Sequence, residues 1–315
     1  MPAIGAHPIP GERRALIGLE TLSVGRHAAM FNLIEENIVS TTTNSTGYGL
    51  KPGGYTARRV PSGLVPDGRA RGPIWDAAER TPRFVDMLTG DPAPLATTSA
   101  IVWDDHALYI AFWADEPNIV ATMDQRDSLL FFENDLEVFV DGGDSYYELE
   151  FNPKGTIYEV FYIWRDAYAR GGKWDTPRFD VLQPSARTFN GDYALDRRNF
   201  WTGNHPRGPR WAFLDYDLPG LEVHVHVDGT LNDPASIDRG WSAEIVIPWN
   251  GLVDLANGRS LPPQPGDTWG IFMGRFEQLR TRGPAEVATA GWSAHRFGVA
   301  DTHVPECFTQ VTFVA

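Results

Sequence analysis

Residues 133–152 read ENDLEVFVDGGDSYYELEFN, and they are the most informative part of the sequence. Gly142 and Gly143 supply the positive φ angles of a two-residue turn, so the stretch predicts a β-hairpin centred between them. That register places Glu137 opposite Glu148. Because side chains alternate along a strand, apolar residues share one face of the hairpin and acidic residues share the other. The acidic face carries Asp135, Glu137, Glu148 and Glu150.

This acidic face needs an explanation, because like charges opposite each other destabilise a sheet. Water can solvate the carboxylates, a cation or an arginine can neutralise them, or one of them can hold a proton with a raised pKa. Alternatively, they accept hydrogen bonds from a polyhydroxyl ligand, and a charged acceptor strengthens such bonds. The ligand interpretation requires that the acidic side chains line a recess open to guest molecules.

The rest of the chain favours an all-β fold. Runs of five to eight residues rich in Val, Ile, Tyr, Phe and Trp recur between turn residues, and long amphipathic helix patterns are scarce. This pattern favours a β-sandwich or a β-barrel over a parallel α/β sheet, with short helices at 76–80 and 250–256. The predicted strands are Ser99–Trp103, Ala107–Ala114, Asp135–Val140, Tyr146–Phe151, Thr156–Ile163, Glu222–Val227, Trp241–Ile247, Thr268–Phe276 and Phe308–Phe313.

Two segments differ from this pattern. Residues 1–69 are predicted to be an N-terminal extension that packs on or precedes the sandwich, with one short helix near residues 16–22. Residues 70–315 are predicted to form the sandwich itself. Within it, residues 165–219 form a long irregular insertion with several tryptophans among Gly, Pro and Arg. Insertions of this length are usually functional or disordered.

Composition excludes several classes of function. The formal net charge of −14 repels a phosphate backbone, so we expect no nucleic-acid partner. A single cysteine, Cys307, rules out a disulfide framework and a cysteine-based zinc site. No apolar run reaches the length of a membrane span, so no membrane partner is expected. The first residues show no signal peptide, which indicates a cytoplasmic protein, or a secreted one whose leader has been removed.

Several motifs, in order, resemble the family 9 carbohydrate-binding modules. The acidic strand and the following Asn152-Pro153-Lys154-Gly155 are the core of the resemblance. Each motif is loose, and their shared order over about residues 70–315 makes the match specific. The other matching segments are Trp103-Asp104-Asp105, Leu108-Tyr109-Ile110-Ala111, residues 226–232, residues 240–249, Gly266-Asp267-Thr268-Trp269, Arg275, Trp292-Ser293 and residues 303–308.

The resemblance implies a two-sheet antiparallel β-sandwich of about ten strands, similar to immunoglobulin or jelly-roll folds, which binds sugars, often beside calcium. It also implies that Glu137 occupies the position of a sugar-contacting glutamate. The two tryptophans that clamp the sugar in familiar modules are replaced here: Phe131 or Phe132 stands at one position, and Thr302 stands near the other. Trp174 and Trp201 of the insertion are the expected replacements.

Two further sets of residues are candidates. Arg275 alternates with apolar residues on its strand, so it is expected either to pair with the acidic cluster or to contact the ligand. Asp141 and Asp144 flank the Gly-Gly turn and are candidate calcium ligands, although turn aspartates are common for local reasons.

The sequence therefore predicts a carbohydrate-binding protein that grips an oligo- or polysaccharide with a carboxylate cluster and stacked aromatic rings. The expected ligand contacts are Asp135, Glu137, Glu148, Glu150, Phe132, Trp174, Trp201 and Arg275. The alternative is a carbohydrate-active enzyme, a glycoside hydrolase or lyase that uses paired carboxylates, with or without a metal. A third interpretation is an interaction domain whose acidic face meets a basic partner. The residues leave open whether the protein is an enzyme.

Overall fold

Short β-strands dominate the part of the chain that the structure, a computed structural model, describes: residues 52–191, 196–202, 205–280, 287–299 and 301–315. These residues belong to one structural unit, residues 48–315. The all-β prediction is confirmed, and each of the nine predicted strands overlaps an observed one. The helix expected near residues 16–22 lies outside the described residues.

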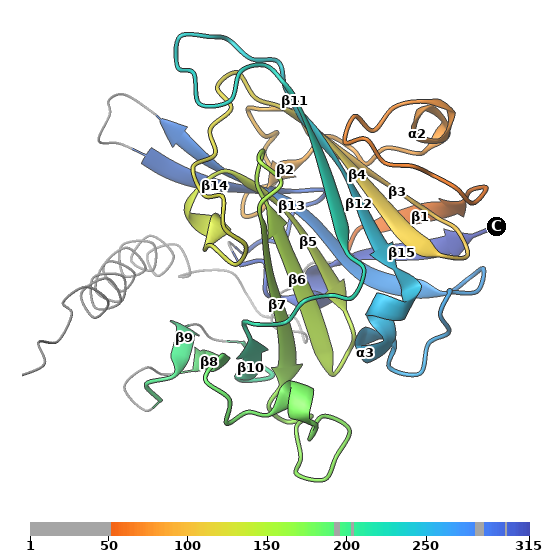
Figure 1. Ribbon diagram of the computed structural model, residues 1–315, viewed down its shortest axis with the longest axis vertical. Helices are drawn as coiled ribbons and strands as arrows, with labels where there is room; N and C mark the ends of the chain where they lie inside the picture. Colours follow the sequence, from red (N-terminus) through yellow and green to blue (C-terminus); the bar gives the residue numbers. More distant parts are fainter. Residues whose placement is uncertain (1–51, 192–195, 203–204, 281–286, 300) are drawn as a thin grey trace, which may run out of the picture. The chain divides into compact units, whose positions relative to one another are not determined.

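The elements are labelled in Figure 1. The strands are β1 (Gly54–Arg59), β2 (Val85–Asp86), β3 (Thr97–Trp103), β4 (Ala107–Asp115), β5 (Asp135–Asp141), β6 (Ser145–Phe151), β7 (Ile157–Trp164), β8 (Ala186–Gly191), β9 (Asn199–Thr202), β10 (Arg210–Phe213), β11 (Glu222–Asp228), β12 (Gly240–Pro248), β13 (Thr268–Arg280), β14 (Val287–Ser293) and β15 (Thr309–Val314). The α-helices are α2 (Pro73–Ala77) and α3 (Val253–Ala256), near the two expected positions, and the 3₁₀ helices are η1 (Leu130–Phe132), η2 (Pro177–Phe179), η3 (Trp249–Leu252) and η4 (Pro305–Cys307). No helix in the described ranges combines the length and the apolar character that a bilayer crossing requires.

The strands form one hydrogen-bonded ladder in place of the two separate sheets that were expected. Its order is β11-β12-β4-β3-β1-β15-β13-β5-β6-β7-β10-β8-β9, and β14 pairs with β13 and β2. Most pairs are antiparallel, but β1 is parallel to both β15 and β3, and β8 is parallel to β9. Because β1 pairs with strands from both halves, it joins them into a single ladder.

The two halves of the ladder nevertheless pack against each other as layers. Phe112 of β4 contacts Phe151 of β6, with ring centroids 6.0 Å apart, and Trp241 of β12 lies 6.1 Å from Phe151. Aromatic edge-to-face pairs of this kind stabilise a core beyond the area that they bury. The apolar face predicted for the hairpin lies in this core, with Leu136, Val138, Val140, Tyr147, Leu149 and Phe151 all buried.

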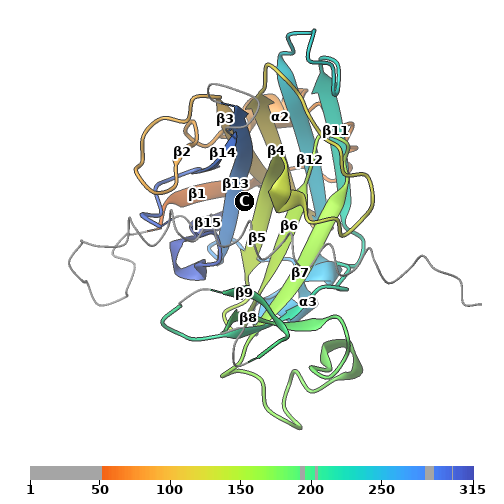
Figure 2. The same ribbon diagram turned by 90° about the vertical axis from the view of Figure 1, so that its left-hand side faces the viewer.

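The two atypical segments contribute strands to the ladder. Residues 54–59 fall in the expected N-terminal extension and form β1, in the middle of the ladder. The expected insertion, residues 165–219, is more regular than predicted, because β8, β9 and β10 lie within it. β10 pairs with β7 and extends the layer that contains the acidic hairpin (Figures 1 and 2).

Candidate functional site

The acidic hairpin forms as predicted, with a different register. β5 and β6 are antiparallel, and Glu137 lies directly opposite Glu150, whereas Glu148 lies opposite Phe139. The expected pairing of Glu137 with Glu148 is therefore wrong by two residues. Because two is the period of a strand, the shift leaves every side chain on its predicted face.

The turn explains the shift. Asp141 pairs with Tyr146, so four residues, 142–145, connect the paired positions instead of two. The Gly142 N–H donates to the Ser145 carbonyl oxygen at 2.8 Å, and the Gly143 N–H donates to Asp141 Oδ1 at 2.7 Å. Gly143 has a φ of 76°, a conformation that glycine adopts at little cost. The aspartate side chain thus takes part in a longer loop than the Gly-Gly pair suggested.

The acidic side chains are buried rather than open to solvent. Their exposed fractions are 0% for Asp135, 1% for Glu150, 2% for Glu137 and 3% for Glu148. Two surface hollows, of about 410 Å³ and 550 Å³, are lined by residues 168–182 and by residues near Trp249 and Leu261, respectively. Neither hollow is lined by the carboxylates. The expectation of an open recess above Glu137 and Glu148 is therefore not met.

Side chains of the neighbouring strands explain this burial. On β13, Gly274 lies opposite Glu137, and a Cβ at Gly274 would lie 2.3 Å from Phe272 Cζ, so the Phe272 ring occupies that space. On β7, Tyr158 lies opposite Glu150. Aromatic rings of β13 and β7 therefore flank the carboxylates on both sides. The buried cluster on this face also includes Phe139, Tyr146, Val160, Tyr162, Phe189, Phe297, Val304 and Phe308.

Glu148 is the acidic residue of this face with the clearest protein partners. The Tyr162 hydroxyl donates to Glu148 Oε2 at 2.6 Å, and His303 Nε2 lies 3.7 Å from Glu148 Oε1. His303 Nδ1 also lies 3.2 Å from the Tyr146 hydroxyl. Burial lowers the pKa of His303 well below its ordinary value, and Arg210 lowers it further. The imidazole is therefore neutral, and Tyr162 is the donor that holds Glu148.

In the other three carboxyl groups, several oxygens lack such a partner. Both carboxylate oxygens of Asp135 and the Oε2 atoms of Glu137 and Glu150 are buried without a hydrogen-bond partner. One carboxylate oxygen from each residue lies within 4.8 Å of the others. We call these three residues the carboxylate triad. Its three groups are close enough to share one metal ion.

Electrostatics raises the pKa of every carboxyl group in the cluster. Burial, which disfavours the charged form, is the main cause of the raised pKa of Asp135, and Glu150 adds repulsion. The pKa of Glu137 and that of Glu150 also lie well above the ordinary value, through burial and then neighbouring carboxylates. Burial raises the pKa of Glu148 to about 7, although the Tyr162 hydrogen bond counteracts it.

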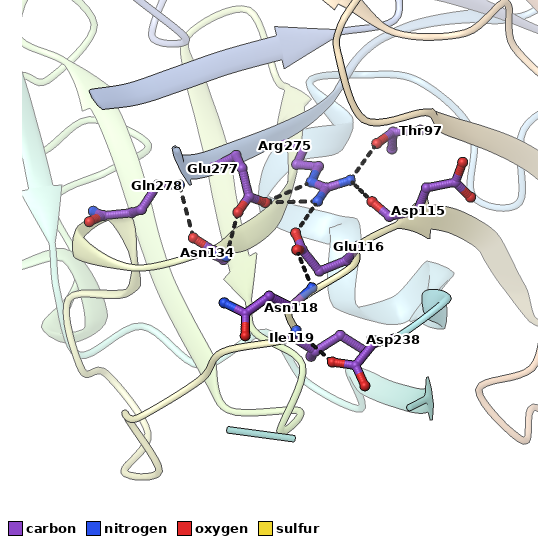
Figure 3. Close-up of polar contacts among 10 residues, drawn as sticks. All are labelled: Thr97, Asp115, Glu116, Asn118, Ile119, Asn134, Asp238, Arg275, Glu277 and Gln278. Atoms are coloured by element: carbon purple, nitrogen blue, oxygen red, sulfur yellow. Dashed lines mark hydrogen bonds and ion pairs between the residues drawn. The ribbon is translucent and has the colours of Figure 1, made fainter. Parts of the chain in front are cut away.

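Arg275 does not reach this cluster, contrary to one expectation. It lies opposite Leu136 in the ladder and therefore points to the core face of the hairpin. Its guanidinium group is 1% exposed and forms ion pairs with Glu116 and Glu277, both at 2.7 Å (Figure 3). It also donates to Thr97 Oγ1 at 3.0 Å. The alternation along β13 was read correctly, but Arg275 belongs to the opposite set of side chains from the carboxylates.

The Arg275 network extends into two loops, as Figure 3 shows. Glu116 accepts from the Asn118 N–H at 2.9 Å, and Asn134 joins Glu277 to the Gln278 backbone. Burial raises the pKa of Glu277 to about 7, against the attraction of Arg275. These contacts fix the loops before β5 and after β4, which flank the acidic hairpin.

Two of the three predicted aromatic contacts lie near the carboxylates. Phe132 of η1 lies 4.6 Å, ring to ring, from Phe131, which also contacts Tyr158 at 5.9 Å and Trp201 at 6.3 Å. Tyr158 lies opposite Glu150, so this group of rings borders the triad. Trp174, by contrast, packs in the core on the other side of the sheet, against Phe161 and Phe179.

Asp141 and Asp144, the two predicted calcium ligands, have local partners. Asp141 accepts from the turn, and Asp144 forms an ion pair with Arg207 at 3.5 Å. Among the described residues, three acidic groups with metal-ligand spacing occur at the triad and not at this turn.

Sequence reasoning did not place Tyr162, His303 and Arg210 at the acidic cluster. The alternation of the strand at 156–163 places Tyr158 and Tyr162 on one face, and that signal was available. His303 reaches the cluster from a loop near the C-terminus, and no local pattern indicates it. Arg210 is fully buried, donates to the His303 carbonyl and packs 4.1 Å from the Trp164 ring. It lies in a segment predicted to be irregular.

Comparisons with known proteins give structural likenesses only. No protein-family model and no curated protein matches the chain. Among solved structures, a protein from Bacteroides uniformis ATCC 8492 described as carbohydrate-binding has a TM-score of 0.49 and 16% identity, and the alignment covers 83% of this chain and 99% of that one. A family 9 carbohydrate-binding module from Caldicellulosiruptor kristjanssonii, solved with cellotriose, has a TM-score of 0.44 and 12% identity, covering 83% and 93%. A structure of such a module with glucose has a TM-score of 0.42 and 12% identity, covering 82% and 95%. The similar structures therefore include the family whose motifs the sequence resembles.

Proposed function

We propose that the protein binds a carbohydrate at the buried carboxylate cluster of β5 and β6. The observation that carries this proposal is an excess of unpaired acceptors: four oxygens of Asp135, Glu137 and Glu150 are buried without a donor. Each such group that is left unpaired in a dry interior costs about 1–3 kcal/mol. A ligand that brings many donors removes this cost.

Sugar hydroxyls match the chemistry of the site. Each hydroxyl donates one hydrogen bond, and a bond to a carboxylate is stronger than a neutral one. Glu148 already accepts from Tyr162, so it is less available than the three residues of the triad. Glu137 is also the position that corresponds to a sugar-contacting glutamate in the family 9 resemblance.

Aromatic rings beside the triad supply the second element of sugar recognition. Phe131, Tyr158 and Trp201 form a connected group of rings at its border. Such rings pack against the apolar C–H faces of a sugar while the carboxylates take its hydroxyls. The structure shows no open recess above the carboxylates, so the proposal requires that part of their cover moves aside and opens one when the ligand binds. We therefore expect slow association, below about 10⁵ M⁻¹s⁻¹.

A glycan array followed by titration calorimetry tests the proposal. The full chain is tested with and without calcium at millimolar concentration, and it should bind at least one class of glycan. Glu137→Gln and Glu150→Gln should each weaken this binding by about tenfold or more. Asp144→Asn is the matched control, since Asp144 lies at the hairpin turn and pairs with Arg207, and it should bind normally. A folded protein that binds no glycan under either condition would refute the proposal.

The same samples separate binding from catalysis. A glycan that the protein binds is incubated with the protein, and chromatography shows whether the glycan has been cleaved. An intact glycan supports the binding proposal. Cleavage that Glu148→Gln abolishes would replace it with the enzymatic alternative.

A further inference from the structure

We infer that the carboxylate triad of Asp135, Glu137 and Glu150 is a binding site for a calcium-sized divalent cation. This site differs from the turn aspartates that the sequence suggested. It also stands without the carbohydrate proposal, because it rests on the geometry and burial of the three carboxylates alone.

The spacing of the triad fits a single ion. Glu137 and Glu150 lie directly opposite each other, and Asp135 precedes Glu137 by two residues on the same face. One oxygen from each residue lies within 4.8 Å of the other two, so an ion at the centre lies at most about 2.8 Å from all three, near the 2.3–2.6 Å of calcium–oxygen bonds. Magnesium demands near-ideal octahedral geometry, whereas calcium accepts irregular sets of oxygen ligands, so calcium is the better match to three carboxylates.

The orphaned oxygens are a second observation that points to a ligand. Asp135 is 0% exposed, and neither of its carboxylate oxygens has a hydrogen-bond partner. The Oε2 atoms of Glu137 and Glu150 are buried and unpartnered as well. A satisfied or solvated acidic cluster would not leave four oxygens in this state. Together, these oxygens surround a position where a positive charge is stabilised.

No cation of the described residues takes that position. Arg275 forms its ion pairs with Glu116 and Glu277 on the other face of the sheet. Arg210 packs on Trp164 and donates to the His303 carbonyl. Among the described residues, no lysine or arginine forms an ion pair with a triad carboxylate. A divalent ion would therefore be the neutralising charge.

The ligand set defines the chemical class of the ion. Three carboxylates offer only hard oxygen ligands, which suit calcium, magnesium and manganese and are less suited to copper or zinc. Positions on the ion that the triad does not fill remain for water or for ligand hydroxyls.

Calorimetry with calcium alone tests the inference. The full chain is stripped with EGTA, dialysed and titrated with CaCl₂, and the wild type should bind about one ion per chain. At a free calcium concentration 100 times the Kd, its unfolding midpoint should rise by about 5–10 °C. Asp135→Asn and Glu150→Gln should each weaken calcium binding by tenfold or more. Asp144→Asn should bind like the wild type, because Asp144 lies outside the triad.

The unfolding temperature of a triad variant, compared with that of the wild type, should also change in opposite directions without and with calcium. In EGTA, Asp135→Asn should unfold at a higher temperature than the wild type, because it removes a buried carboxyl group whose charged form is disfavoured by burial and by Glu150, whereas with calcium the order should reverse. A folded wild type that shows no binding heat and no midpoint shift at millimolar calcium would overturn the inference. Undiminished binding by both triad variants would overturn it as well. If a variant fails to fold, the wild-type titration and Glu137→Gln decide the question.

Discussion

Glu137 and Glu150 lie directly opposite each other on adjacent strands, and both are buried. A like-charged pair in this position destabilises a sheet even where it is exposed. The hairpin forms because its other face buries six apolar side chains, each worth about 1.5–3 kcal/mol. Core packing therefore fixes the position of the two carboxylates, and their chemistry depends on what neutralises them.

Arg275→Met should destabilise the protein by about 3–5 kcal/mol, because it leaves the buried Glu116 and Glu277 without their shared cation. Urea denaturation measures this loss. Arg239→Met is the control, since Arg239 forms an exposed ion pair with Asp228, and its removal should change stability little. Equal effects of the two substitutions would contradict the structural role assigned to Arg275.

Glu277→Gln should flatten the pH dependence of stability. The pKa of Glu277 is raised from 4.5 to about 7 in the folded state, so the native protein holds more protons than the unfolded chain between these values. The contribution of Glu277 to the free energy of unfolding therefore falls as the pH rises through this window, and it is constant above the window. A shift of this size corresponds to about 3 kcal/mol.

The measurement is the free energy of unfolding of wild type and Glu277→Gln from pH 4 to pH 8. The difference, wild type minus variant, should decrease by up to about 3 kcal/mol across the window. Parallel curves would show that Glu277 does not titrate there. Because Glu116 still pairs with Arg275 in the variant, the network keeps one ion pair at every pH in this range.

Tyr162→Phe should cost about 1–3 kcal/mol, because it removes the hydroxyl that donates to buried Glu148 Oε2 at 2.6 Å. A double-mutant cycle with Glu148→Gln isolates the interaction between the two side chains. The coupling energy should be close to 1 kcal/mol or larger by chemical denaturation. Strictly additive effects would mean that this hydrogen bond contributes nothing to stability.

Trp174→Ala and Trp201→Ala should separate stability from binding. Trp174 is 2% exposed in the core, and its loss should cost about 3–5 kcal/mol without acting directly on the ligand. Trp201 is half-buried beside Phe131, so Trp201→Ala should cost less stability and should weaken glycan binding. Thermal melts and calorimetry on both variants decide between these roles. The reverse outcome would assign the ligand contact to Trp174.

The strands were predictable because alternation with a period of two is a local property. It located nine segments and separated the two faces of the acidic hairpin correctly. Several of the strands that it missed are short: β2 has two residues, and β9 and β10 have four each. β1 reads GYTARR, and its place between β3 and β15 depends on partners far along the chain.

Contacts between distant residues were not predictable in the same way. Arg275 and Glu116 are 159 residues apart, and their ion pair exists because the pairing of β13 with β5 turns Arg275 toward the core face. His303 likewise reaches Glu148 from a loop far along the chain. Alternation tells which side chains of one strand share a face. It does not tell which face of the neighbouring strand they meet.

The sequence by itself determined that the chain is all-β and that Asp135, Glu137, Glu148 and Glu150 lie on one face of a hairpin. Only the tertiary structure decided that this face is buried, that several oxygens of three of its carboxylates lack partners, and that Arg275 is directed elsewhere. The physical reason is that the direction of a side chain follows from the local backbone, whereas its burial and neutralisation depend on which distant segments pack over it.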